Sequence, residues 1–188
     1  MTTLTGPCEE AQILAERTAE ALHNSKRTVA AAESITCGNI AAALAAAPNA
    51  SQWFRGSVVA YSREVKFSVL RVDPGPVITS SCVQQMAVNV RRLLGADIAV
   101  ATTGAGGPGR EEDQPAGTVF IGIATPDGCS TRECHFLGEP SEIVHEATLQ
   151  ALRDLADAVV EDPRSQAHTS PDPSHQKTGL SLSMESGR

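Results

Sequence analysis

The sequence predicts an α/β fold, a three-layer α/β/α sandwich built around a mixed β-sheet. Short apolar segments of strand character alternate along the chain with longer segments in which apolar residues recur at helical spacing. Helical crossovers between strands imply parallel neighbours, whereas two late strand-like segments are joined by a short turn and are therefore antiparallel. Together these observations predict both the layers and the mixed character of the sheet.

The first part of the alternation predicts a helix, a strand and a second helix. Residues 9–22 place their apolar side chains on one side, as an amphipathic helix does. Residues 28–32 form a short, mainly apolar segment, which is typical of an interior strand. Thr36 is expected to cap the next helix, residues 37–47, which Pro48 ends.

The middle part predicts a strand followed by two helices. Residues 56–61 are expected to form a strand, and residues 62–70 a short helix capped by its first serine. A longer helix follows, from a cap at Ser80 or Ser81 to residue 94, because apolar residues recur there at helical spacing.

The last part predicts a buried strand, a hairpin and a final helix. Residues 97–102 contain the apolar run Ile98-Ala99-Val100-Ala101, as in strands buried on both faces, and a glycine-rich turn follows at residues 103–109. Residues 117–125 and 129–136 form two strands around a Pro-Asp-Gly turn. A helix capped by Ser141 is expected to reach about residue 160.

Composition fits one globular domain, which we assign to residues 1–161. At residues 162–188 the composition shifts to Pro, Ser, Gln, His and Thr, which predicts a disordered tail. Hydrophobic residues make up 41% of the chain and aromatic residues 3%, so the core is expected to consist of small side chains. The five cysteines form no CxxC pair and are expected to be reduced, and no metal-ligand spacing is present.

Charge and hydropathy exclude several classes of partner. The formal net charge is −7 and the positive residues are scattered, so nucleic-acid binding is not expected. The N-terminus lacks the basic start and apolar run of a signal peptide, and no apolar segment approaches a membrane span. We therefore expect a cytoplasmic protein with no membrane partner.

Ser34 and Lys66 are the residues that indicate chemistry. Ser34 lies at a strand-to-helix turn, where amides at the start of a helix could hold a developing oxyanion. Lys66 follows Tyr61 by about one helical turn, and a neutral lysine can activate a serine where no histidine is available. Considered singly, the serine could equally be a capping residue and the lysine a solvated one, so the residues alone leave both interpretations open.

Two neighbouring features are also ambiguous. Glu33 could bind backbone amides or orient a ligand. The glycine-rich segment after Thr103 lacks the Gly-Lys-Ser/Thr ending of a phosphate loop, so a simple wide turn is an equally good interpretation.

Six short motifs, taken in order, are more specific than any of these residues. They are Glu33-Ser34-x-Thr36-x-Gly38, Phe54-Arg55-Gly56, Tyr61-Ser62-x-x-x-Lys66, Thr103-Gly104-x-x-Gly107-Pro108, Pro115-x-Gly117-Thr118-Val119 and Phe136-x-Gly138. Together they closely resemble the CinA C-terminal domain family over residues 8–160.

The resemblance implies an activity, because stand-alone members of that family are nicotinamide-nucleotide amidohydrolases (NMN deamidases). They convert nicotinamide mononucleotide to nicotinate mononucleotide and ammonia without a metal or other cofactor. It implies that Ser34 attacks the amide carbon, that Lys66 takes its proton and that Tyr61 supports the transfer. It also implies a set of residues that bind the nucleotide substrate: Glu33, Thr36, Gly38, Thr103, Gly104 and Gly107.

The chain departs from the family pattern at two positions that concern the site. Cys37 stands where the family has glycine, and its side chain could crowd the substrate unless the residue keeps helical dihedrals. Pro140 stands where the family has an arginine, which we interpret as a partner of the phosphate. Three other arginines could replace it in space: Arg63, Arg110 and Arg132.

These departures keep two alternatives open beside the deamidase. The chain could be a degenerate member that binds a nucleotide or a protein without turnover, or an amidohydrolase for a different, non-phosphorylated amide. Relatives commonly assemble, so a homo-oligomer is a further expectation.

Overall fold

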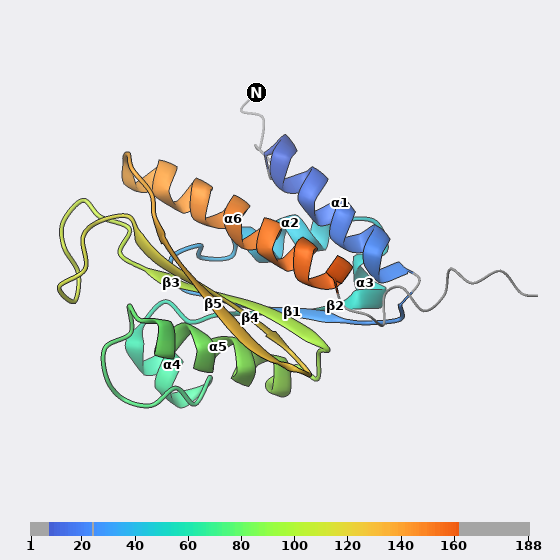
Figure 1. The fold of residues 1–188 in the computed structure, drawn as a ribbon, viewed down its shortest axis with the longest axis horizontal. Coiled ribbons are helices and arrows are strands. Elements are labelled where there is room, and N and C mark those ends of the chain that lie inside the picture. The colour runs from blue at the N-terminus through green and yellow to red at the C-terminus, as the bar shows by residue number, and fades with distance from the viewer. Residues whose placement is uncertain (1–7, 24, 162–188) are drawn as a thin grey trace, which may run out of the picture.

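Five strands form one mixed sheet in the computed structural model, which describes residues 8–23 and 25–161 (Figure 1). The strands are β1 (Val29–Glu33), β2 (Phe54–Val59), β3 (Ile98–Gly104), β4 (Thr118–Thr125) and β5 (Gly128–His135). They lie in the order β2-β1-β3-β4-β5. β1 is parallel to both β2 and β3, whereas β3, β4 and β5 are antiparallel neighbours.

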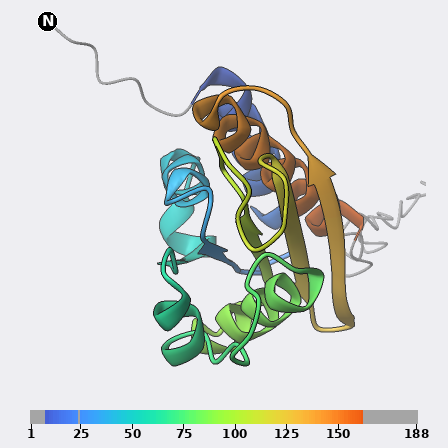
Figure 2. The same cartoon turned by 90° about the vertical axis from the view of Figure 1, so that its left-hand side faces the viewer.

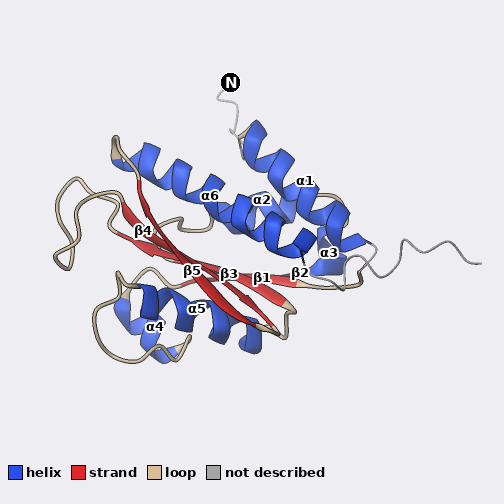
Figure 3. Ribbon diagram, viewed as in Figure 1, coloured by secondary structure: helices blue, strands red, loops and turns tan. Residues whose placement is uncertain are grey.

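Helices cover both faces of this sheet, which confirms the predicted three-layer α/β/α sandwich (Figure 3). The helices are α1 (Glu9–His23), α2 (Asn39–Ala46), α3 (Ala50–Trp53), α4 (Arg63–Ser68), α5 (Ser80–Leu93) and α6 (Pro140–Glu161). α1, α2, α3 and α6 lie above the sheet in the view of Figure 1, and α4 and α5 lie below it.

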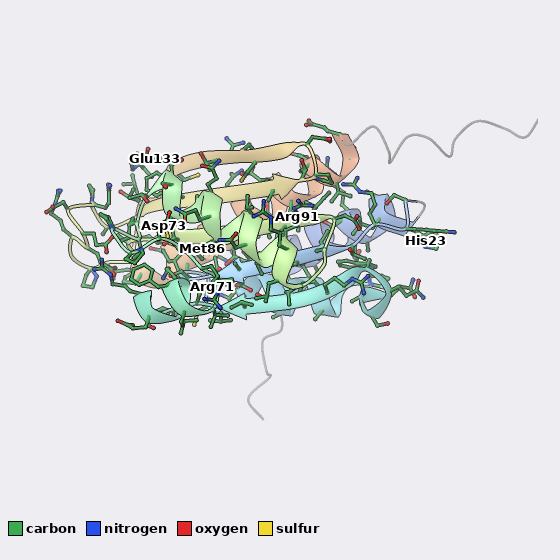
Figure 4. The ribbon with its side chains drawn as sticks, turned by 90° about the horizontal axis from the view of Figure 1, so that it is seen from below. His23, Arg71, Asp73, Met86, Arg91 and Glu133 are labelled. Carbon is green, nitrogen blue, oxygen red and sulfur yellow. The ribbon has the colours of Figure 1, made fainter. Side chains whose placement is uncertain are left out.

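Each face of the sheet has its own apolar core. The core under α1, α2 and α6 includes Leu14, Leu44 and Leu152, all buried. The core on the other face includes Met86 and Val83 of α5; Figure 4 looks onto this layer and labels Met86. β1 passes between the two cores, and three consecutive alanines in it leave room for helices on both sides.

Local chemistry accounts for the helix starts, two of which differ from expectation. α5 is capped by Thr79, whose Oγ1 accepts a hydrogen bond of 3.1 Å from the Cys82 amide, rather than by Ser80 or Ser81. α6 begins at Pro140, one residue before the expected cap, because a proline at the first helical position loses no internal hydrogen bond. The short α4 is capped by Ser62 as predicted.

Other expectations have mixed outcomes. α3 was not predicted from the sequence. The predicted tail, residues 162–188, lies outside the described residues. The five cysteines are unpaired, as expected. Within the described ranges no helix is both long enough and apolar enough to span a membrane.

Candidate active site

A cavity of about 220 Å³ lies at the carboxyl ends of β1 and β3. Figure 2 shows this end of the molecule, with the connection after β3 between α4 and the start of α6. Six of the nine predicted site residues line the cavity: Ser34, Tyr61, Lys66, Thr103, Gly104 and Gly107. A larger cavity of about 560 Å³ lies near the amino ends of β1 and β2, but no serine, threonine, cysteine or tyrosine lines it. The smaller cavity therefore contains the candidate chemistry.

Ser34 and Lys66 meet in this cavity. The distance between Lys66 Nζ and Ser34 Oγ is 2.9 Å, although the residues are 32 positions apart in the chain. Lys66 is only 1% exposed and Ser34 is 7% exposed. The lysine is therefore a buried partner of the serine and not a solvated helix residue.

Two main-chain carbonyls hold the lysine in place. Nζ lies 2.9 Å from the Ala60 oxygen and 3.2 Å from the Tyr61 oxygen. An ammonium would donate to both carbonyls and to the serine hydroxyl. A neutral amine has two N–H groups for the same two carbonyls, and its lone pair is left to accept the hydroxyl proton of Ser34. The three partners therefore accommodate the basic form of the lysine as well as the ammonium.

Burial favours that basic form, because it lowers the pKa of Lys66 below the ordinary value of 10.5. Cys82 and the carboxylates of Glu111 and Glu112 oppose the shift, and the nearby Arg63 adds to it. Burial raises the pKa of Cys82 to about 11, so this neighbour stays a neutral thiol near neutral pH and is not a counter-ion.

The turn that carries Ser34 is joined to both neighbouring strands. The Ser34 amide donates to the Thr102 carbonyl of β3 at 3.1 Å, and the Ala60 amide donates to the Glu33 carbonyl at 2.7 Å. These bonds place the end of β1 beside the residue that precedes Tyr61. Ser34 is consequently positioned by main chain on both sides, as a nucleophile requires.

Glu33 binds backbone amides, which is one of the two roles that the sequence left open for it. It is fully buried, and its carboxylate accepts hydrogen bonds from the amides of Gly38, Ile40 and Ala41 at 2.9–3.1 Å. It also accepts the Ser57 hydroxyl at 3.1 Å. The carboxylate thus satisfies the free amides at the start of α2.

Thr36 and Gly38 also fall outside the cavity. Thr36 does not cap α2; its hydroxyl shares a 2.8 Å hydrogen bond with that of Thr102, and the residue is fully buried. Gly38 precedes α2 with a φ of 98°, and its amide is bound to Glu33. The expected oxyanion site at the start of α2 is therefore occupied by the protein's own carboxylate.

Cys37 does not crowd the cavity. Its φ of 46° lies in the left-handed region, so it does not keep the helical dihedrals that we expected of a tolerated side chain. The side chain is exposed and does not line the cavity. A left-handed φ is one that glycine adopts without strain, so the backbone alone is sufficient reason for a glycine at this position.

Tyr61 and Thr103 reach the cavity in different ways. Tyr61 lines the mouth with a side chain that is 70% exposed, and it contacts the lysine through its main-chain carbonyl. Thr103 is buried and donates its hydroxyl to the Val77 carbonyl at 2.8 Å. Thr103 thus fixes the segment before α5 against the end of β3.

The connection between β3 and β4 lies across the mouth of the cavity. Glu112 anchors it, because one carboxylate oxygen accepts the amides of Val77 and Ile78 at 2.6 and 2.9 Å. The other oxygen lies 3.0 Å from the Arg63 guanidinium. Sequence reasoning missed Glu112, because its partners are 34 to 49 residues away in the chain.

Of the three arginines considered as replacements, Arg63 alone lines the cavity. Arg110 donates to the Asp113 carbonyl within its own loop. Arg132 pairs with Asp154 of α6 at 2.8 Å, in a different depression of the surface. Pro140 does line the cavity, at the start of α6.

Among the described residues, no group of three or more His, Cys, Asp or Glu could hold a metal ion.

Comparisons of sequence and of structure with known proteins point to the same family. A family model described as the CinA C-terminal domain matches residues 11–159. A CinA-like protein from Frankia casuarinae is 41% identical over 150 residues, which cover 77% of this chain but 35% of that protein. The chain thus spans about a third of that relative's length.

Two crystal structures from Klebsiella pneumoniae share the fold. A competence-damaged protein (CinA) superfamily protein from strain 700603 has a TM-score of 0.76 at 34% identity, covering 79% of this chain and 97% of that one. The competence damage-inducible protein A (ComA) has a TM-score of 0.77 at 33% identity, covering 80% of this chain and 98% of that one.

Proposed function

The chain belongs to the CinA C-terminal domain family, and from this premise we propose that it is a serine–lysine amidohydrolase for nicotinamide mononucleotide. The products would be nicotinate mononucleotide and ammonia. The observation that carries the proposal is the 2.9 Å distance between Ser34 Oγ and the buried Lys66 Nζ. A nucleophile, a base with a lowered pKa and a cavity beside them meet the geometric requirements for acyl transfer.

The first half of the reaction forms an acyl-enzyme. Neutral Lys66 takes the hydroxyl proton as Ser34 Oγ bonds to the amide carbon, which gives a tetrahedral intermediate. The lysine ammonium then gives this proton to the amide nitrogen. The carbon–nitrogen bond breaks, ammonia leaves, and an ester to Ser34 remains.

The second half returns the enzyme to its resting form. Lys66, neutral again, takes a proton from a water molecule whose oxygen attacks the ester carbon. The ester bond to Ser34 breaks, the serine recovers its proton from Lys66, and the product leaves as a carboxylic acid that loses its proton to water. The two carbonyls of Ala60 and Tyr61 can accept from the lysine nitrogen in both of its protonation states.

The oxyanion must be stabilised from elsewhere than the start of α2, because Glu33 occupies those amides. Gly106 and Gly107 line the cavity, and main chain without side chains can approach a substrate closely. We assign oxyanion stabilisation to the peptide groups of this glycine-rich segment.

The test is ammonia release from nicotinamide mononucleotide by the purified protein. We expect turnover that falls by about 10³-fold or more in Ser34→Ala. Ser81→Ala is the matched control, because Ser81 is an exposed serine outside the cavity. Turnover that survives in Ser34→Ala would refute the serine mechanism.

The alternatives give different results in the same assay. Pro140, which lines the cavity where the family has an arginine, favours a loss of phosphate recognition. Ammonia from an unphosphorylated amide alone would identify an amidohydrolase of different specificity. Saturable binding of the nucleotide without ammonia release would identify a binding module.

A further inference from the structure

The cavity contains a second cation that the proposed chemistry does not use. Among the residues that line the cavity, the positively charged types are Lys66 and Arg63. Lys66 is buried and has three partners in the protein. Arg63 is half-exposed at the mouth, so it is the cation that a ligand entering the cavity can reach.

Two contacts hold the Arg63 guanidinium in one orientation. One terminal nitrogen lies 3.0 Å from Glu112, and the other donates to the Gly75 carbonyl at 2.8 Å. A guanidinium has five N–H groups in a plane, and these two contacts use only part of them. A pre-positioned planar fork is the arrangement that binds phosphate oxygens in a bidentate manner.

Glu112 positions this arginine without fully neutralising it. Its carboxylate also accepts two peptide amides, those of Val77 and Ile78, so part of its charge is offset by groups other than the arginine. The half-exposed arginine thus keeps positive potential toward the mouth. Glu111 lines the same cavity and would repel an anion that Arg63 did not hold.

We infer that Arg63 is a specificity-determining residue, which selects amide substrates that carry an anionic group, a phosphate in the case of nicotinamide mononucleotide. The inference rests on the proposed function of the cavity. Arg63 and Lys66 are three residues apart on α4 and therefore share one side of it. One ligand can accordingly place its amide at Ser34 and Lys66 and its anionic end at Arg63.

The test compares nicotinamide mononucleotide with nicotinamide riboside, which has the same amide but no phosphate. In Arg63→Gln we expect KM for the mononucleotide to rise tenfold or more, with kcat within about threefold. KM for the riboside should stay within about twofold. Arg63→Lys should give an intermediate KM because it keeps the charge but loses the fork.

Two further variants distinguish the positioning of Arg63 by Glu112 from a general loss of activity. Glu112→Gln, which keeps Arg63 but removes its carboxylate partner, should raise KM for the mononucleotide less than Arg63→Gln does. Arg92→Gln, an exposed arginine of α5 outside the cavity, should behave as wild type. Equal changes of KM for both substrates in Arg63→Gln, or no change for either, would overturn the inference.

A binding measurement keeps this test independent of turnover. If the wild-type protein releases no ammonia, the proposed function fails. Titration calorimetry with the mononucleotide and the riboside then measures recognition directly. A Kd that favours the mononucleotide in wild type and not in Arg63→Gln supports the role of Arg63, and equal affinities for the two ligands in wild type refute it.

Discussion

The sequence suggested Lys66 as a candidate base, but it could not predict that the side chain is buried. On a helix of six residues, a lysine between two half-buried apolar residues, Val65 and Phe67, has no periodicity that would indicate its burial. Only the fold encloses it, through contacts with Ser34 and the end of β2. The order of the family motifs, and not the pattern around the residue, pointed to it.

The lowered pKa of Lys66 predicts how activity depends on pH. Only the neutral amine can accept the serine proton, so ammonia release should rise with pH through the pKa of the folded protein and then level off. Initial rates measured across a pH series test this. A rate that is flat or falls over that range would contradict the role of Lys66 as base.

The same residue predicts how stability depends on pH. Its pKa is lower in the folded chain than the ordinary 10.5, so between these two values the unfolded state binds more protons. Lys66 should therefore make the free energy of unfolding rise with pH across that interval. Above and below the interval it should add no further dependence on pH. Urea unfolding at several pH values should show that Lys66→Met removes this contribution, whereas Lys26→Met, at an exposed lysine, keeps it.

At the scale of elements, the turn from β1 to α2 shows where prediction from sequence stops. The positions of the strand and the helix were predicted to within two residues. The tasks of Thr36 and Gly38 were not predicted, and that of Glu33 only as one of two alternatives, because each depends on where a side chain or amide points at a turn with positive φ angles. Such a turn has no periodic pattern from which direction could be inferred.

Glu33 should be needed for folding more than for catalysis. In Glu33→Gln one carboxylate oxygen becomes an NH₂ group, which faces amide donors at the start of α2 and leaves them unpaired. We expect the free energy of unfolding to fall by roughly 2–3 kcal/mol. Urea denaturation measures this loss.

Ser57→Ala is the matched control for that measurement. It removes one donor to the same carboxylate and should cost only about 1 kcal/mol. Unchanged stability of Glu33→Gln together with a raised KM would restore the substrate-binding role first expected of Glu33.

At the scale of the whole molecule, the layers were predictable but the order of the strands was not. Alternation of strands and helices determines which elements exist and that crossovers separate them. Which strand pairs with which is decided by contacts between distant segments, such as β1 between β2 and β3. The same holds for the cavity, to which the chain contributes from Ser34 to Val144.

Close packing between α5 and the sheet gives a prediction at this scale. A Cβ added at Gly122 of β4 would lie 2.9 Å from the Val83 carbonyl oxygen, nearer than real Cβ atoms come. Gly122→Ala should therefore push α5 away from the sheet and lower the free energy of unfolding by roughly 1–3 kcal/mol. Gly109→Ala, where nothing lies within 4 Å, is the control. Equal stability of the two variants would contradict the close approach.

The pairing of Ser34 with Lys66 joins the two helical layers at the edge of the sheet. Ile35, next to the serine, packs in the core under α1, α2 and α6, whereas Ala60 and Leu70, on either side of the lysine segment, pack in the core beside α5. The side chains of β1, which leads to Ser34, alternate between the two cores, so the pairing of Ser34 with Lys66 depends on both of them. The activity proposed above would therefore return during refolding only after both cores have formed.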